Sequence, residues 1–150
     1  MLGRYDTALT TDPFAHHEWI AQRNKDLNYR LKPMVRMLKH WNNVHSKYLK
    51  GFHIEVMAAT AFTSLGGDSR KACELFFQWA QSNLAVSDPA GHGGDLSSYL
   101  SYSARIAFIS NLESARQRAT KANAAEATGD HEEAIRLWRI IFGSEFPTYG

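Results

Sequence analysis

Apolar residues between positions 31 and 45 recur at intervals of three and four, which is the spacing of one face of an amphipathic α-helix. This face consists of Leu31, Met34, Val35, Leu38, Trp41, Asn42 and His45. On the opposite face, Lys32, Arg36, Lys39 and Asn43 follow the same intervals. The pattern predicts a helix that packs by one side and exposes three cationic side chains in a stripe, where a phosphate chain or a carboxylate-rich surface would fit.

A turn at Lys50-Gly51 separates this helix from a second one. Between Phe52 and Phe62 the apolar residues lie on nearly every side of the predicted helix, as expected for a segment surrounded by others. By this pattern alone, Phe52 is a core aromatic residue at the start of a buried helix. The two helices together form the centre around which we expect the remaining chain to pack.

Turn and capping residues divide the remainder of the chain into further helices. The boundaries are Asp12-Pro13, Leu65-Gly66-Gly67-Asp68, the glycine-rich loop 87–94 with Asp95 after it, Gly129-Asp130 and Gly143. Apolar spacing places Phe14 on the inner side of the first helix and Ile106 on the inner side of the long fifth helix. Residues 1–12 show no useful period and are expected to form an extended lead-in. The chain is thus predicted to be all-α, a single domain over residues 1–150 with about six helices.

Composition and charge exclude several functional classes. The 150 residues are 44% hydrophobic, which argues against disorder, and 17 Lys and Arg against 15 Asp and Glu give a net charge of +2. So small a charge leaves no global basic field, and no DNA-binding motif is present. The single cysteine, Cys73, forms no internal disulfide, and no apolar run approaches the roughly 20 residues that span a bilayer. We expect a cytoplasmic protein without a membrane partner, in which any anion site is local.

The carboxylates that support metal-assisted phosphoryl transfer are not grouped in this sequence. No Gly-Ser is followed by a paired Asp-x-Asp or Glu-x-Asp strand, the arrangement that holds two Mg²⁺ ions in nucleotidyltransferases. None of the seven histidines forms an H-x-x-x-H pair, and no Cys-x-x-Cys supports them. Cys73 lies in an apolar helical period, which indicates an inert thiol. We therefore expect neither a catalytic residue nor a metal site in this chain.

Four patches of sequence occur in an order that is similar to a known family. They are LKPMVRMLKHWN at residues 31–42, LKGFHIEVMA at 49–58, DPAGHGGDLSSYLS at 88–101 and AEATGDHEEAIRLWRIIFG at 125–143. They resemble the C-terminal helical half of bacterial oligonucleotide second-messenger synthetases, nucleotidyltransferases related to cyclic GMP-AMP synthase and oligoadenylate synthetase. The resemblance implies that the family's catalytic half, with its Mg²⁺ or Mn²⁺ ions, is missing here, and that Thr11-Asp12-Pro13 is the turn leading out of it.

The resemblance also implies roles for Lys39 and Phe52. By spacing alone, Lys39 is a solvated lysine and Phe52 is an aromatic residue of the core. In the family, the lysine of the Leu-Lys-x-Trp-Asn motif contacts the nucleotide triphosphate, and Lys39 matches it. The aromatic residue at the start of the following helix stacks on the nucleobase, and Phe52 matches it. The family's usual serine before that aromatic, a phosphate ligand, is Gly51 here. Lys32 and Arg36 lie on the same stripe as Lys39 and are expected to support phosphate binding.

The resemblance implies a function and leaves an alternative open. The chain is expected to be the nucleotide-binding helical half of a cyclic (oligo)nucleotide synthetase in an anti-phage second-messenger system, inactive alone and able to bind a nucleoside triphosphate weakly. Its partners would be the missing catalytic half, or a second copy that covers the exposed apolar surface. The alternative is a non-catalytic helical domain that binds a protein partner, or a fragment of a split gene.

Overall fold

The computed structural model describes residues 13–89 and 94–144. The expected lead-in over residues 1–12, with the first part of the Thr11-Asp12-Pro13 turn, and residues 90–93 of the glycine-rich loop lie outside the described residues. The all-α prediction is confirmed, since the described parts of the chain form six helices. These helices are α1 (Pro13–Asp26), α2 (Leu31–Val44), α3 (Gly51–Ala61), α4 (Ser69–Ala80), α5 (Tyr102–Ala127) and α6 (His131–Phe142).

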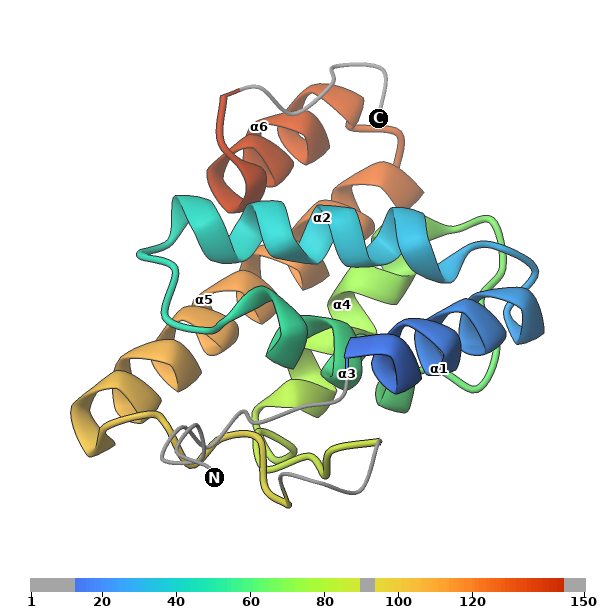
Figure 1. Ribbon diagram of the computed structural model, residues 1–150. Helices are drawn as coiled ribbons and strands as arrows, with labels where there is room; N and C mark the ends of the chain where they lie inside the picture. Colours follow the sequence, from blue (N-terminus) through green and yellow to red (C-terminus); the bar gives the residue numbers. More distant parts are fainter. Residues whose placement is uncertain (1–12, 90–93, 145–150) are drawn as a thin grey trace.

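α2 lies across the middle of the molecule, with α6 on one side of it and α1 and α3 on the other (Figure 1). Its apolar face is buried from Leu31 to Asn42, as the spacing predicts. The ring of Trp41 lies 5.1 Å from that of Phe77 on α4 and 5.5 Å from that of Phe108 on α5, measured between centroids. α2 therefore packs against α1, α3, α4 and α6 and reaches α5 through the ring of Trp41, which places it near the centre of the core.

Side-chain caps begin α4 and α6, and a glycine ends α6, where the sequence indicates. Asp68 accepts a hydrogen bond from the backbone N–H of Lys71 at 3.1 Å, and Asp130 accepts one from the backbone N–H of Glu133 at 3.2 Å. Each cap gives a partner to an N–H group that the first turn of a helix leaves unsatisfied. Gly143 follows α6 with a φ of 92°, a conformation that side-chain-bearing residues rarely adopt. The predicted starts of α4 and α6 and the predicted end of α6 are thus confirmed, whereas α4 ends at Ala80, before the loop 87–94 that the sequence indicated as the next boundary.

Two apolar residues that the spacing placed inside lie on the surface instead. Phe14 is 70% exposed and Ile106 is 52% exposed. The buried side of α1 contains Ile20, and Phe14, six positions earlier, lies about 120° from it around a helix of 3.6 residues per turn. On α5 the buried residue is Phe108, two positions and therefore about 200° away from Ile106. Both placements were wrong, because apolar residues near the helix ends do not share the phase of the buried face.

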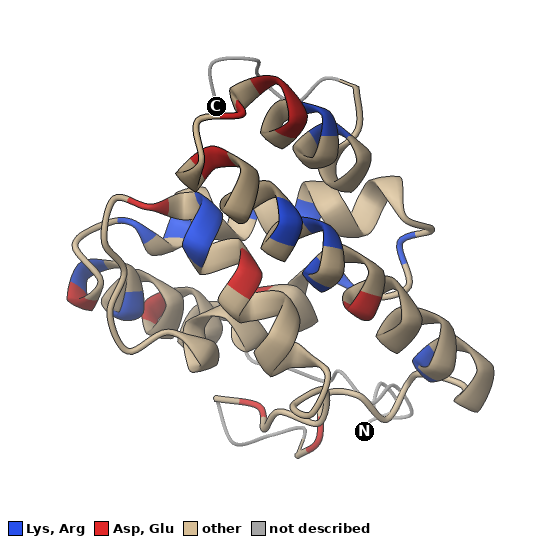
Figure 2. Cartoon of the chain, turned by 180° about the vertical axis from the view of Figure 1, so that it is seen from behind, with Lys and Arg blue, Asp and Glu red and all other residues tan. Residues whose placement is uncertain are grey.

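The surface carries charges of both signs. In the view from behind, Lys and Arg lie among Asp and Glu, and neither sign occupies a whole face of the molecule (Figure 2). None of the described helices is both long enough and apolar enough to cross a membrane. A binding site for an anion must therefore depend on a local arrangement of side chains.

Candidate functional site

A pocket of about 240 Å³ lies where α1, α2 and α3 meet. The residues that line it are His16, His17 and Ile20 of α1, Lys32, Val35, Arg36 and Lys39 of α2, and Glu55 of α3. All three cationic side chains predicted on the exposed stripe of α2 contribute to this single pocket. Phe52, the fourth predicted site residue, is adjacent to it through the ring of His16.

Lys39 is not the freely solvated lysine that its position on a polar stripe suggests. Its ammonium group forms an ion pair with the Glu55 carboxylate, and its side chain is 37% exposed. Its aliphatic stem passes close to the first residue of α3, since a Cβ placed on Gly51 would lie 3.2 Å from Lys39 Cε and 3.5 Å from Nζ. The glycine at this position therefore leaves room for Lys39 to lie against the start of α3.

The start of α3 offers a second source of positive potential beside Lys39. Lys50, the residue preceding the helix, forms no side-chain cap. The first turn of a helix leaves backbone N–H groups without partners in the helix, and these groups carry a partial positive charge. An anion is stabilised at such a terminus, and more so when a lysine lies next to it. Lys39 and the first turn of α3 together form an arrangement suited to a phosphate group.

Glu55 is the carboxylate of the pocket, and both of its oxygens have partners. Oε2 accepts from Lys39, and Oε1 accepts from Nε2 of His16 at 2.8 Å. Burial alone would raise the pKa of Glu55, but the hydrogen bonds and positive charge of Lys39 and His16 bring the pKa below its ordinary value. The group is therefore ionised at neutral pH. The Nδ1 atom of His16 is buried and has no hydrogen-bond partner among the residues that the structure describes.

Phe52 is half-buried, which is intermediate between a core residue and an open platform. The ring of His16 lies edge-on to it, with 4.1 Å between centroids and 61° between planes. Part of the aromatic ring is therefore covered by α1, and a base would have to stack on the part that remains. His16 and Glu55 were missed by the sequence reasoning, although Glu55 stands out as the acidic residue in an otherwise apolar helix.

A chain of hydrogen bonds that runs from the core to the surface fixes the start of α3. The Nε2 atom of His53 donates to the carbonyl of Leu84 at 2.8 Å, and its Nδ1 accepts from the Tyr99 hydroxyl at 2.9 Å. The same hydroxyl accepts from the backbone N–H of Lys50 at 2.9 Å. Burial lowers the pKa of His53 despite the opposing effect of the Leu84 bond, so the ring is neutral at pH 7. These bonds orient the helix terminus that faces Lys39.

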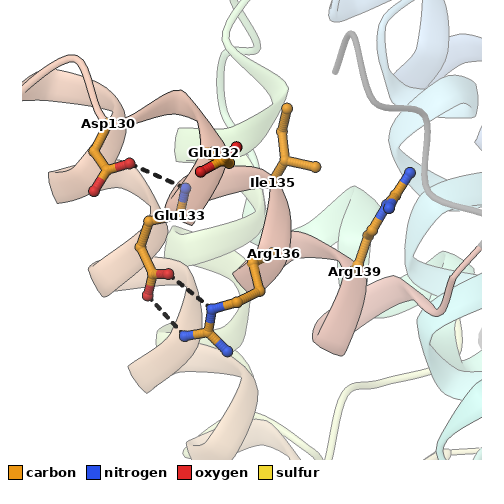
Figure 3. Close-up of a pocket in the computed structure, with 6 residues that line it drawn as sticks. All are labelled: Asp130, Glu132, Glu133, Ile135, Arg136 and Arg139. Carbon is orange, nitrogen blue, oxygen red and sulfur yellow. Dashed lines mark hydrogen bonds and ion pairs between the residues drawn. The ribbon is translucent and has the colours of Figure 1, made fainter.

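A wider groove of about 620 Å³ runs along α6 (Figure 3). It is lined by Asp130, Glu132, Glu133, Ile135, Arg136 and Arg139. Asp130 is engaged in capping the helix, and both carboxylate oxygens of Glu133 accept from Arg136 at 2.7 Å. Glu133 and Arg136 are thus paired within the groove, and we favour the pocket between α1, α2 and α3 as the anion site, because three cationic side chains line it.

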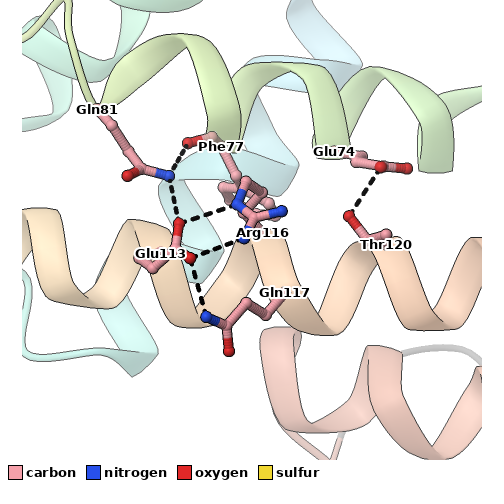
Figure 4. A network of polar contacts seen from close by, with 7 residues as sticks. All are labelled: Glu74, Phe77, Gln81, Glu113, Arg116, Gln117 and Thr120. Atoms are coloured by element: carbon pink, nitrogen blue, oxygen red, sulfur yellow. Dashed lines mark hydrogen bonds and ion pairs between the residues drawn. The ribbon is translucent and has the colours of Figure 1, made fainter.

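A further network of polar side chains joins α4 to α5 and serves packing (Figure 4). Glu113 accepts from Arg116 at 2.9 and 2.7 Å, from Gln117 at 2.9 Å and, at 3.0 Å, from Gln81, the residue that follows α4. The hydrogen bonds from Arg116, followed by those from Gln117 and Gln81, lower the pKa of Glu113 to about 2. Because its donors come from α5 and from the residue that follows α4, the network links these two helices.

The chain is similar to bacterial cyclic oligonucleotide synthases, although no family model matches it. It is 26% identical to a probable cyclic nucleotide synthase of Bacillus cereus (strain VD146), over 93% of this chain and 43% of that protein. It is 28% identical to a cyclic AMP-AMP-AMP synthase of Acinetobacter sp. (strain ATCC 27244 / 9458), over 93% of this chain and 43% of that protein. It is 30% identical to a cyclic AMP-AMP-GMP synthase of Enterobacter hormaechei subsp. hoffmannii (strain UCI 50), over 93% of this chain and 40% of that protein.

These comparisons confirm the resemblance to cyclic oligonucleotide synthetases that the four sequence patches indicate. The similarity extends over 93% of the chain. The chain spans less than half the length of each of these relatives, which fits the resemblance to one half of such an enzyme.

Proposed function

We propose that this chain is the nucleotide-binding helical part of a cyclic oligonucleotide synthase-like nucleotidyltransferase, and that the pocket between α1, α2 and α3 receives a nucleoside triphosphate. The observation that carries the proposal is the position of Lys39, which lies against the first turn of α3. A lysine that lies beside a helix N-terminus provides the two kinds of positive potential that commonly bind phosphate. Phe52, beside the same helix start, supplies a partial platform for the base.

Arg36 and Lys32 extend the phosphate site along α2. They precede Lys39 by three and seven positions, which places the three cations on one side of the helix over about 10 Å of its axis. A triphosphate that contacts Lys39 with one phosphate therefore has further cations within reach of the others. Because Arg36 and Lys32 are exposed, salt should weaken their contribution within a screening length of about 10 Å at 0.1 M.

Catalysis belongs, in this proposal, to a separate half. Phosphoryl transfer with two metal ions requires grouped carboxylates. The described residues contain no group of three or more His, Cys, Asp and Glu side chains arranged to hold a metal ion. The chain alone would then form no product, and the Mg²⁺ or Mn²⁺ ions would be bound by the catalytic half. The complete enzyme would make a nucleotide second messenger in the cytoplasm as part of anti-phage defence.

Replacing Lys39 by methionine tests the phosphate assignment, because it removes the charge and keeps the apolar stem. We expect the affinity for ATP, measured calorimetrically at low salt without metal, to fall about tenfold. This is the low end of the range for a charge-assisted hydrogen bond, since Lys39 must leave Glu55 to bind phosphate. Lys121→Met removes the same charge from the exposed surface of α5 and should bind as the unaltered chain does. Equal affinities for Lys39→Met and the unaltered chain would refute the assignment.

A helical interaction domain remains the second candidate. Tyr102 and Ile106, one turn apart on α5, are 80% and 52% exposed. Two apolar side chains on one helix face are suited to contact with a protein partner, whether the catalytic half or a second copy. Contact of this kind does not require Lys39, so the titration above separates the two candidates.

A further inference from the structure

The carboxylate of Glu55 lies in the same pocket as the three cations proposed to bind phosphate. We propose that Glu55 acts as a gate. Its carboxylate holds the ammonium group of Lys39 while the pocket is empty, and it thereby restricts the site to polyphosphate ligands. This inference rests on the proposed function, because it concerns the same pocket and names the class of ligand that the pocket accepts.

The gate follows from the hydrogen-bond partners of the two carboxylate oxygens of Glu55. Oε2 is bound to Lys39, on the adjacent helix, and Oε1 is bound to His16, on a third helix. A phosphate oxygen that reaches the ammonium of Lys39 must take the position of Oε2 or share the ammonium with it. Since Glu55 is ionised, the incoming phosphate also meets a like charge. Binding is therefore opposed unless the ligand gains contacts elsewhere.

His16 allows the gate to open without moving Glu55. When Lys39 turns toward a phosphate, the carboxylate keeps the hydrogen bond from Nε2 of His16. The His16 side chain is 13% exposed, and its packing against Phe52 fixes the ring in place. The flexible stem of Lys39, which lies over a glycine, is free to swing a short distance. Only the lysine needs to change conformation.

The arrangement selects for the length of the phosphate chain. A single phosphate that binds Lys39 displaces the contact between Lys39 and Glu55 and gains one contact with the ammonium group. It also lies beside the Glu55 carboxylate, which repels it. A linear polyphosphate that also contacts Arg36 and Lys32, which line the same pocket and are exposed, gains contacts that no pairing with Glu55 opposes. The geometry therefore favours a triphosphate over orthophosphate or a nucleoside monophosphate.

The variant Glu55→Gln tests the gate, because glutamine keeps the shape of the side chain and removes its charge. We expect inorganic tripolyphosphate and ATP to bind about tenfold more tightly to this variant than to the unaltered chain. Orthophosphate, which should not bind measurably to the unaltered chain, should bind to the variant. Glu126→Gln is a matched control, since Glu126 also pairs with a histidine, at 2.9 Å from His131, but lies outside the pocket. It should leave all three affinities unchanged.

The result that overturns the gate is an affinity of Glu55→Gln for tripolyphosphate equal to or below that of the unaltered chain. Glu55→Asp, which withdraws the carboxylate by one methylene, provides a second measurement if the first variant fails to fold, and it should bind tripolyphosphate more tightly than the unaltered chain. The two proposals fail in different ways. If Lys39→Met binds as the unaltered chain does, the phosphate site itself is refuted; if only the Glu55 variants show no gain, the gate alone is refuted.

Discussion

Replacing Trp41 by alanine should lower the free energy of unfolding by about 3–5 kcal/mol. The side chain is 1% exposed, and its ring packs against Phe77 and Phe108 from two other helices. Truncation would leave a cavity where α2, α4 and α5 meet. Because a domain of this size is stable by only about 5–15 kcal/mol, a large share of the stability would be lost. Urea denaturation followed by circular dichroism measures the change.

Trp19→Ala provides the control for this effect. Trp19 is also a tryptophan, but it is half-buried on α1 at the edge of the core. Its removal exposes less apolar surface to water and leaves no enclosed cavity, so we expect less than half of the loss found for Trp41→Ala. Equal losses for the two variants would contradict the position of α2 at the centre of the core.

Replacing Phe52 by alanine should affect both binding and stability, because the ring is half-buried. We expect a loss of stability of about 1–2 kcal/mol, below the range of about 3–5 kcal/mol for a fully buried phenylalanine. The affinity for ATP should fall by about 1–3 kcal/mol, which is the contribution of one base stacked on an aromatic ring. Binding of tripolyphosphate, which has no base, should change little. Thermal melting and calorimetric titration measure the two effects.

Phe62→Ala serves as the matched control for Phe52→Ala. Phe62 is a second phenylalanine, buried at the end of α3 against Phe76, and does not line the pocket. Its truncation should cost more stability than that of Phe52 while leaving the ratio of ATP to tripolyphosphate affinity unchanged. If Phe52→Ala unfolds the domain as strongly and leaves that ratio unchanged, Phe52 is a core residue and the base platform is refuted.

The helices could be predicted from the sequence because their signals are local. The apolar spacing of α2 and the caps at Asp68 and Asp130 depend on residues within one or two turns of each other. The same reasoning failed for Phe14 and Ile106, since the buried face of a helix is set by its neighbours in space. A helix that contains apolar residues on several sides does not reveal which side will face the core.

The pocket could be predicted only in part. The stripe that contains Lys39 follows from spacing within α2, and its match to the family motif is visible in the sequence. The ion pair with Glu55 joins residues 16 positions apart, and the contact of Glu55 with His16 joins residues 39 positions apart. Such pairs depend on how α1, α2 and α3 cross, which no local pattern encodes. The contacts of Glu55 with Lys39 and His16 therefore require the fold and could not be predicted from the sequence.

The central claim is that a triphosphate binds between Lys39 and the first turn of α3. Amide NMR spectra recorded during a titration with ATP test it most directly, because weak binding still shifts the resonances of the residues it touches. We expect the largest shifts at the backbone N–H groups of Gly51 and Phe52 and in the part of α2 around Lys39, with little change in α6. Shifts confined to the groove along α6, or no shifts at millimolar ATP, would contradict the account.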